Sequence, residues 1–306
     1  MKSNVLQKIK RQEADYIIHS LSTWRYVKSL GFDSYPWQKD VLSSFAKRIL
    51  IDGARQSGKS TIICTKPAHH AKFYPGSLSI IVASTEKQAG EDMEKVKDFI
   101  GHDPFYPALV KSNEEMIELE NSSRIIIVAA TERSARGYSN PDLILLDEAS
   151  RIEDVVYKSG IRPMLTDNPK CELIVISTPN GREGFFYKAY LSARWERYEI
   201  RAPWDVDEEA IKLVPAMPEA KFQALRAAAG IRGFYSPRHA NLEEQQENLE
   251  EMGPTMYRQE YCVEFVEPDD QVFSYDDVQK MFDNDVKAMD FGLVQKTNTP
   301  ALEVPV

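Results

Sequence analysis

Cysteine and long apolar runs are both scarce in this sequence. Its three cysteines, Cys64, Cys171 and Cys262, lie far apart without metal-ligand spacing, which argues against a disulfide framework and fits a reducing compartment. No apolar stretch is long enough to span a bilayer, and residues 1–18 lack the apolar core of a secretory signal. The sequence therefore predicts neither a disulfide-stabilised fold nor a membrane-spanning helix.

Positive charge is also in short supply. The chain has 38 Lys and Arg residues against 47 Asp and Glu residues, which gives a net charge of −9. A protein that binds nucleic acid strongly by itself is usually basic, so any nucleic-acid contact here is expected to be local, transient or shared among subunits. With 306 residues, 42% of them hydrophobic, the chain can bury a substantial core, and we expect one large domain and a smaller one.

What the sequence does contain is a phosphate-binding loop in residues 50–61, LIDGARQSGKST. Gly53, Gly58, Lys59 and Ser60 match the pattern G-x-x-x-x-G-K-S/T. An apolar run precedes the loop and an apolar-rich segment follows it, and this strand–loop–helix context favours a true phosphate loop over a glycine turn that happens to precede a lysine. Glycines let backbone N–H groups turn toward phosphates, and the helix N-terminus adds a partial positive charge.

Each position of the loop has an expected role in binding ATP. Lys59 would reach the β- and γ-phosphates, and the Ser60 hydroxyl would ligate Mg²⁺. Gln38 lies fifteen residues before the loop in a short predicted helix, where its amide can recognise an adenine edge; an exposed helix-face glutamine is the alternative. The predicted nucleotide-binding residues are Gln38, Gly53, Arg55, Gln56, Ser57, Gly58, Lys59, Ser60 and Thr61.

A second motif, DLILLDEAS at residues 142–150, is the acidic partner that a phosphate loop needs. Four apolar residues predict a central strand with Asp147 at its carboxyl end, where ligands bind in open α/β sheets. Asp147 is predicted to hold Mg²⁺, and Glu148 to orient and deprotonate the attacking water. The alternative, a strand that ends in a solvated acidic turn, is disfavoured because two matched motifs occur in the right order.

The next predicted strand, CELIVISTPNG at residues 171–181, ends in a pair of short hydroxyl side chains. Ser177 and Thr178 would face the γ-phosphate from beside Asp147 and report its presence to a neighbouring element. A Ser-Thr pair that merely caps a strand before a proline turn is the alternative, and we favour the sensor interpretation.

Three arginines are candidates for contacting the γ-phosphate. Arg55 lies inside the phosphate loop and could serve the nucleotide of its own subunit, whereas Arg133 and Arg136 lie in the polar loop TERSARGYSN. An arginine on such a loop could act as an arginine finger toward a neighbouring subunit, could contact DNA, or could be plain surface. The predicted catalytic residues are Lys59, Glu148, Arg55 and Arg136, and Arg136 is the one predicted to act as the arginine finger.

The order of apolar segments predicts an α/β fold. Apolar strands such as residues 77–84 alternate with amphipathic helices such as residues 86–100, whose charges we assign to a solvated face. This alternation indicates a mostly parallel sheet covered by helices on both faces, as in an ASCE/RecA-like P-loop NTPase. Segments 116–119 and 124–129 predict a hairpin. Residues 2–30 predict a helix.

Three regions are expected along the chain. Residues 1–204 would form the P-loop ATPase core with its N-terminal helical segment. Residues 205–270, rich in Glu, Ala, Gln and Leu, would form a small helical lid subdomain that closes with a helix running into a strand at 255–266. Residues 271–306 would contain one further strand, 286–294, and a loosely ordered tail.

Taken together, these motifs resemble one family. Gln38, the loop GARQSGKS with its internal arginine, LILLDEAS, STPNG and YRQEYCVEF are similar to the ATPase domain of the large terminase subunit, the motor that packages viral DNA into phage capsids. The resemblance covers about residues 30–270. It implies Mg²⁺-dependent ATP hydrolysis that drives translocation of double-stranded DNA.

The resemblance also implies partners and a second activity. Family members work as a ring, most often a pentamer, on a portal protein of the procapsid in the host cytoplasm, and a small terminase subunit feeds them DNA; an isolated subunit can be a monomer. The family carries a C-terminal nuclease of RNase H-like fold, whose first metal-binding carboxylate matches Asp290. Only sixteen residues follow Asp290, so the chain is expected to resemble an ATPase-domain fragment, natural or made by truncation, without nuclease activity.

Two other functions stay open at this point. A superfamily 2 helicase, a DNA-dependent ATPase, also has a glutamine motif, a phosphate loop, a DEA-type motif and a Ser-Thr motif, but it needs a second RecA-like lobe. The roughly 100 residues after Trp204 are too few and too helical for that lobe. A nucleotide-gated scaffold without turnover is the third alternative, and the presence of Glu148 argues against it.

Overall fold

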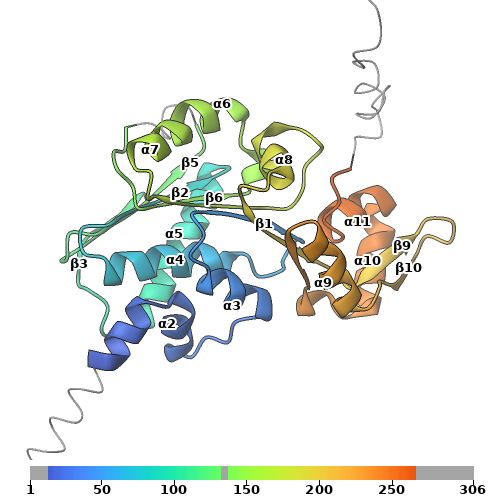
Figure 1. Ribbon diagram of the computed structural model, residues 1–306, viewed down its shortest axis with the longest axis horizontal. Helices are drawn as coiled ribbons and strands as arrows, with labels where there is room; N and C mark the ends of the chain where they lie inside the picture. Colours follow the sequence, from blue (N-terminus) through green and yellow to red (C-terminus); the bar gives the residue numbers. More distant parts are fainter. Residues whose placement is uncertain (1–12, 132–136, 267–306) are drawn as a thin grey trace, which may run out of the picture. The chain divides into compact units, whose positions relative to one another are not determined.

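A nine-stranded sheet forms the centre of the computed structural model, which describes residues 13–131 and 137–266 (Figure 1). Its strands, in spatial order, are β11 (Ile231–Tyr235), β8 (Glu196–Arg201), β1 (Arg48–Gly53), β7 (Glu172–Ser177), β6 (Leu143–Asp147), β2 (Leu78–Ala83), β5 (Arg124–Ala129), β4 (Met116–Leu119) and β3 (Leu109–Ser112). All neighbours from β11 to β5 pair in parallel, and β3–β4–β5 are antiparallel. The predicted mostly parallel sheet and the predicted hairpin are thus confirmed.

The central strands are parallel because their sequences can be buried on both faces. Strands β1, β2, β6 and β7 are buried at almost every position, as is typical of a parallel sheet between two helical layers. Alternate side chains enter different cores: Ile49 and Ile51 join one cluster, and Leu50 joins the other. Two hydrophobic cores therefore pack against opposite faces of the same strands.

Helices cover both faces of the sheet (Figure 1). One layer contains α2 (Thr23–Ser29), α3 (Pro36–Ser43), α4 (Ser60–Phe73) and α5 (Glu86–Gly101). The other contains α6 (Asp154–Val156), α7 (Arg162–Asp167) and α8 (Gly184–Leu191), together with the 3-10 turn η1 (Ala149–Arg151) and the π-helical turn η2 (Tyr157–Ile161). This arrangement is the predicted α/β class.

The segment after Trp204 differs from the helical prediction. It contains a two-stranded hairpin, β9 (Trp204–Asp207) with β10 (Lys212–Pro215), and the edge strand β11 of the main sheet, beside α9 (Glu219–Ala228), η3 (Pro237–His239), α10 (Leu242–Met252) and α11 (Pro254–Glu260). The segment is predicted to be helical except for a closing strand at 255–266, so the prediction missed strands β9, β10 and β11. Strand β11, with the sequence IRGFY, is short and contains Arg and Gly, so its apolar alternation is weak.

The ends of the described region also depart from prediction. The helix predicted for residues 2–30 is interrupted: residues 13–20 are helical, and α2 starts anew after Ser22, whose hydroxyl caps it by accepting from the backbone N–H of Arg25. The strand predicted to follow α11 is absent from residues 261–266. Residues 1–12, and the further strand predicted at 286–294, lie outside the described residues.

Two of the absences inferred from sequence can be compared with the structure. Cys64, Cys171 and Cys262 are free thiols in the structure. In the parts of the chain that the structure describes, no helix combines the length and the apolar character that a bilayer crossing needs.

Candidate nucleotide site

The predicted site residues that the structure describes lie at one edge of the sheet. Strand β7 lies between β1 and β6, and all three run parallel. Their carboxyl ends therefore place the phosphate loop after Gly53, the hydroxyl pair after β7, and Asp147 side by side. This edge is where ligands bind in open α/β sheets.

The phosphate loop has the backbone conformation that its glycines permit. Gln56 and Gly58 have positive φ angles of 57° and 97°, which cost a non-glycine residue free energy. A Cβ atom at Gly53 would lie 3.1 Å from Lys59 Cδ, and one at Gly58 would lie 3.0 Å from Gln38 Nε2. The first glycine thus makes room for the lysine, and the second allows both the turn and a close contact with α3.

The start of the loop is held from behind by backbone hydrogen bonds. The N–H of Ala54 donates to the carbonyl of Ile200 on β8 at 2.7 Å, and the N–H of Arg55 donates to the carbonyl of Glu260 on α11 at 2.8 Å. The loop is therefore tied to the segment after Trp204 as well as to the sheet.

Lys59 is buried at the centre of the site. Its ammonium donates to the carbonyls of Gly53 at 2.7 Å and Ala54 at 2.9 Å, and to Thr178 Oγ1 at 3.1 Å. Burial lowers the pKa of Lys59, and the nearby Glu148 acts against this shift. All three hydrogen-bond acceptors are neutral, so the charge of Lys59 has no direct carboxylate partner among the described residues.

Gln38 connects α3 with the phosphate loop. Its Oε1 accepts from the N–H of Tyr35 at 2.8 Å, and its Nε2 donates to the carbonyl of Gly58 at 2.9 Å. The residue is buried, at 3% exposure, so the alternative of an exposed helix-face glutamine is wrong. Its predicted contact with adenine stays a prediction.

Asp147 lies buried at the end of β6, at 4% exposure. Burial raises the pKa of its carboxyl group to about 7, with further contributions from Asp92 and Glu148. Asp147 Oδ2 accepts from Gln88 Nε2 of α5 at 3.2 Å. A carboxylate crowded by two others is a favourable neighbour for a cation.

Glu148 has the left-handed backbone conformation, with φ 49° and ψ 44°. Such a conformation costs a non-glycine residue on the order of 1 kcal/mol and is concentrated at functional sites. The turn directs the chain from β6 into η1, and the side chain, which is 32% exposed, lies 3.9 Å from the guanidinium of Arg151.

The hydroxyl pair at the end of β7, Ser177 and Thr178, connects the phosphate loop with the acidic motif. Thr178 Oγ1 donates to the carbonyl of Gly53 at 3.2 Å as well as accepting from Lys59. Ser177 Oγ donates to Ser150 Oγ at 2.7 Å, and Ser150 Oγ donates to the carbonyl of Thr178 at 2.8 Å. The pair therefore contacts the phosphate loop on one side and the turn after Glu148 on the other.

The remaining predicted residues are placed as follows. Arg55 is exposed on the loop, and Ser60 is exposed at the first position of α4. Ser57 is buried, with no hydrogen-bond partner for its hydroxyl among the described residues. Arg133, Arg136 and Asp290 lie outside the described residues.

Sequence reasoning missed a buried acid on α5. Asp92 is 0% exposed, so the assignment of all charges of this helix to a solvated face is wrong. A signal was present: Asp92 follows Ala89 by three positions and precedes Val96 by four, and both of these are buried. At helical spacing it belongs to the apolar face.

Two further residues near the loop come from the segment after Trp204. Arg238 donates from Nε to the Tyr35 hydroxyl at 3.2 Å and from Nη1 to the carbonyl of Gln56 at 3.5 Å. Glu260 is buried and lies 3.9 Å from Arg151. Neither residue belongs to a recognisable short motif, so only the fold reveals their position.

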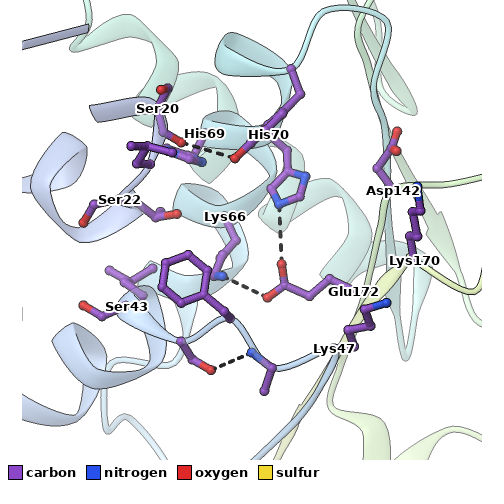
Figure 2. A pocket seen from close by; sticks show the side chains of 17 residues that line it. Ser20, Ser22, Ser43, Lys47, Lys66, His69, His70, Asp142, Lys170 and Glu172 are labelled. Atoms are coloured by element: carbon purple, nitrogen blue, oxygen red, sulfur yellow. Dashed lines mark hydrogen bonds and ion pairs between the residues drawn. The ribbon is translucent and has the colours of Figure 1, made fainter. Parts of the chain in front are cut away.

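A cavity lies at the opposite edge of the sheet (Figure 2). This cavity of about 370 Å³ is lined by Lys47 before β1 and by Glu172 at the start of β7. Lys66 and His70 of α4 both point to Glu172, with N–O distances of 2.8 Å and 3.4 Å. Lys66, His70 and Glu172 are paired with one another, and none of the predicted nucleotide-binding residues lines this cavity.

The residues present fit a magnesium ion shared with a nucleotide. The described residues include no group of three His, Cys, Asp or Glu side chains that could hold a metal ion. Mg²⁺ commonly uses one or two protein oxygens together with phosphate oxygens and water. The exposed Ser60 hydroxyl and the crowded carboxylate of Asp147 are donors of that kind.

Comparisons with known proteins identify relatives of this chain. Residues 50–280 match the family model "Terminase large subunit, T4likevirus-type, N-terminal". The terminase large subunit of Thermus virus P23-45 is 28% identical over an alignment of 191 residues that covers 55% of this chain and 38% of that protein. The chain thus spans less than half the length of this curated relative.

Two solved structures share the fold. The large terminase ATPase domain of Thermus phage P74-26 has a TM-score of 0.55 at 22% identity, covering 79% of this chain and 98% of that one. The large terminase of bacteriophage HK97 has a TM-score of 0.55 at 17% identity, covering 76% and 51%. Together with the family model, which matches most of the chain, these findings show that the chain belongs to the terminase large subunit family and corresponds to its N-terminal part.

Proposed function

We propose that this chain is the ATP-hydrolysing part of a motor that translocates double-stranded viral DNA into a procapsid. The observation that carries the proposal is the convergence of Lys59, Thr178 and Asp147 at one sheet edge in a member of the terminase large subunit family. The division into an ATPase core at 1–204 and a lid subdomain at 205–270 is part of the proposal. A separate hydrophobic cluster that includes Leu213, Leu249 and Tyr257 supports a packing unit within 205–270, whereas β11 of the same segment belongs to the main sheet.

The chemistry follows from the positions of the side chains. Lys59 would exchange its neutral carbonyl partners for the β- and γ-phosphates of ATP, which are stronger acceptors for a buried ammonium. Ser60 and Asp147 would hold Mg²⁺, which neutralises charge on the phosphates when bound. Glu148 would orient a water molecule in line with the γ-phosphate and accept its proton.

The Ser-Thr pair would report on the γ-phosphate. Thr178 contacts both Lys59 and the phosphate loop, while Ser177 contacts Ser150 in the turn after Glu148. A change in the partners of Lys59 would therefore reach the catalytic turn through two hydrogen-bonded hydroxyls. This arrangement supports the proposed sensor role.

The helicase alternative is not favoured. The described residues after Trp204 form a hairpin, the helices α9, α10 and α11, and one edge strand of the main sheet. They therefore contain no second parallel-sheet lobe. Superfamily 2 helicases complete their nucleotide site with such a lobe.

The motor proposal includes partners and an assembled state. We propose double-stranded DNA, a portal protein and a small terminase subunit as partners, and a ring of identical subunits at the procapsid in the host cytoplasm. With a net charge of −9, an isolated chain should bind duplex DNA weakly, without sequence preference, and lose binding steeply as salt rises. That these 306 residues do not cleave DNA is part of the same proposal, since two-metal cleavage needs several converging carboxylates and only Asp290 matches one.

Arginines complete the proposed site. Arg55 would serve its own nucleotide, and Arg136 would act on a neighbour's γ-phosphate. An arginine finger contributes about 10³–10⁵ to turnover, so mixing two inactive variants, Arg136→Ala and Glu148→Gln, should partly restore hydrolysis. Mixtures that stay inactive where the wild type assembles would place Arg136 in its own subunit or outside catalysis, and Arg133 would be the next candidate.

A steady-state ATPase assay with and without duplex DNA tests the proposal. The motor predicts Mg²⁺-dependent hydrolysis that proceeds without DNA and rises more than linearly with protein concentration as subunits gather. Hydrolysis only in the presence of DNA would favour the helicase-like alternative. Tight ATP binding without any hydrolysis would favour a scaffold.

A further inference from the structure

A hydrogen-bonded chain of three side chains runs from α5 to Asp147. Gln88 Nε2 donates to Asp92 Oδ1 at 3.0 Å and to Asp147 Oδ2 at 3.2 Å. Lys95 Nζ donates to Asp92 Oδ1 at 2.9 Å. The amide of Gln88 therefore bridges two carboxylates that would otherwise only repel each other.

The Asp92–Lys95 pair differs from the other ion pairs of α5, which only stabilise the helix. Exposed pairs on the same helix, such as Glu94 with Lys97, lie in solvent and contribute little. Asp92, in contrast, has no solvent exposure, and its Oδ2 is buried without a hydrogen-bond partner among the described residues. Burying a charged carboxylate with an unsatisfied oxygen destabilises the folded protein. Stabilising the helix therefore does not explain why an aspartate occupies this position.

We propose that Gln88 and Asp92 are positioning residues that orient Asp147 for the divalent cation bound with ATP. This inference rests on the proposed function, since it concerns the same site. The bond to Oδ2 fixes the plane of the Asp147 carboxyl group, which sets the direction of its other oxygen. Asp92 in turn fixes Gln88, because it lies one helical turn further along and accepts from the same amide nitrogen.

The support for the cation is mechanical as well as electrostatic. Gln88 lies in the first turn of α5, where its own N–H is capped by the Thr85 hydroxyl at 3.1 Å. Met93 and Val96 anchor the helix in the hydrophobic core. The side chains of Gln88 and Asp92 therefore project from a rigid helix. A divalent cation bound here would reduce the repulsion between the two neighbouring buried carboxylates, Asp92 and Asp147.

Manganese binding tests this inference without relying on turnover. Electron paramagnetic resonance would measure the affinity of Mn²⁺ for protein saturated with a non-hydrolysable ATP analogue, and fluorescence would measure affinity for the analogue alone in EDTA. Gln88→Leu and Asp92→Asn should each weaken Mn²⁺ binding by about 10–100-fold, the usual effect of losing a group that orients a metal ligand. Analogue affinity in EDTA should stay within about twofold, because neither residue contacts the phosphate loop.

Glu94→Gln is the matched control, since it removes an exposed carboxylate of the same helix and should leave Mn²⁺ affinity unchanged. Gln88 is only partly buried, so its variant should fold even if Asp92→Asn does not. Wild-type Mn²⁺ affinity in Gln88→Leu, with wild-type thermal stability, would overturn the inference. If the wild-type protein itself bound no Mn²⁺ with the analogue, the proposed function would fail first.

Discussion

Two buried lysines, Lys59 at the N-cap of helix α4 and Lys66 within the helix, have opposite surroundings. Lys59, at the carboxyl edge of the sheet, donates to two carbonyls and the Thr178 hydroxyl, and burial lowers its pKa. Lys66, two turns further on, forms an ion pair with Glu172 at 2.8 Å. Although burial acts in the opposite direction, Lys66 and His70 lower the pKa of Glu172 to about 2.

The difference separates a charge held for a ligand from a charge held for the fold. A buried ammonium with neutral partners is destabilising until an anion arrives, whereas a paired one is balanced within the protein. Changes at the carboxyl edge should therefore alter nucleotide chemistry with little effect on stability. Changes at the amino edge should alter stability, with little effect on nucleotide chemistry.

The largest expected effect is at Glu148. Glu148→Gln should keep ATP binding and reduce turnover by roughly 10²–10⁴-fold, the usual effect of losing a general base. Thermal unfolding should be nearly unchanged, because the side chain is partly exposed and its contact with Arg151 is long. Normal hydrolysis by this variant, measured at saturating ATP, would refute the assignment of the base.

Lys59→Met should weaken ATP binding by about 10²-fold, as expected for loss of charged hydrogen bonds worth about 3 kcal/mol in total. Its free energy of unfolding without nucleotide should stay level or rise, because folding no longer buries an ammonium whose partners are all neutral. Titration with a fluorescent ATP analogue and denaturant unfolding on one preparation would measure both. A large loss of stability would show that this lysine, too, serves the fold.

Glu172→Gln should show the opposite pattern, since Lys66 would be left buried without its partner. Breaking a buried ion pair in this way costs about 3 kcal/mol of unfolding free energy, while ATP affinity should stay near wild type at temperatures well below melting. Arg48→Gln is the comparison variant, because it changes a charged side chain at the same edge and leaves the Lys66–Glu172 ion pair intact. An unchanged denaturation midpoint for Glu172→Gln would contradict the structural role of the pair.

Acid should remove the contribution of this pair in the wild type. A carboxyl group whose folded pKa is lowered stabilises the protein fully above its unfolded pKa and loses that contribution as pH falls toward the folded pKa. The window runs from about pH 4.5 down to about pH 2, and the contribution is about 3 kcal/mol. The stability difference between wild type and Glu172→Gln should therefore shrink across this window; a constant difference would contradict the pairing.

The smallest expected effect is at Thr178. Thr178→Val removes one neutral hydrogen bond to Lys59 and one to Gly53, so about 1 kcal/mol is at stake. Turnover should fall about fivefold, with ATP affinity close to wild type. A loss as large as that of Glu148→Gln would mean that Thr178 takes part in the chemistry directly.

Much of the site could be predicted from sequence because its elements have strong local signals. Nearly all-apolar strands lead into Gly53, Asp147 and Ser177, and both faces of such strands must be buried. The parallel order then brings their ends together. Arg133, Arg136 and Asp290 stay predictions, since they lie outside the described residues.

The elements that sequence missed are those whose polar groups are satisfied from far away. Strand β8, ERYEIR, buries Glu199 and Arg197, which looks unfavourable in sequence. In the fold, Glu199 pairs with Arg226 of α9 at 2.8 Å, and Arg197 donates to the carbonyl of Tyr190 at 2.8 Å. Asp92 differs from these residues, because its hydrogen-bond partners Gln88 and Lys95 lie on the same helix and its helical spacing already placed it on the apolar face.

Hydrogen exchange with and without ATP and Mg²⁺ tests the central claim most directly, because one measurement reports on both edges of the sheet. The Glu148→Gln variant would keep the nucleotide intact during labelling. We predict slower exchange in residues 53–61 and in peptides that contain Asp147 or Thr178, and no change in residues 43–47 or around Glu172. Protection around Glu172, with none in the phosphate loop, would contradict the account.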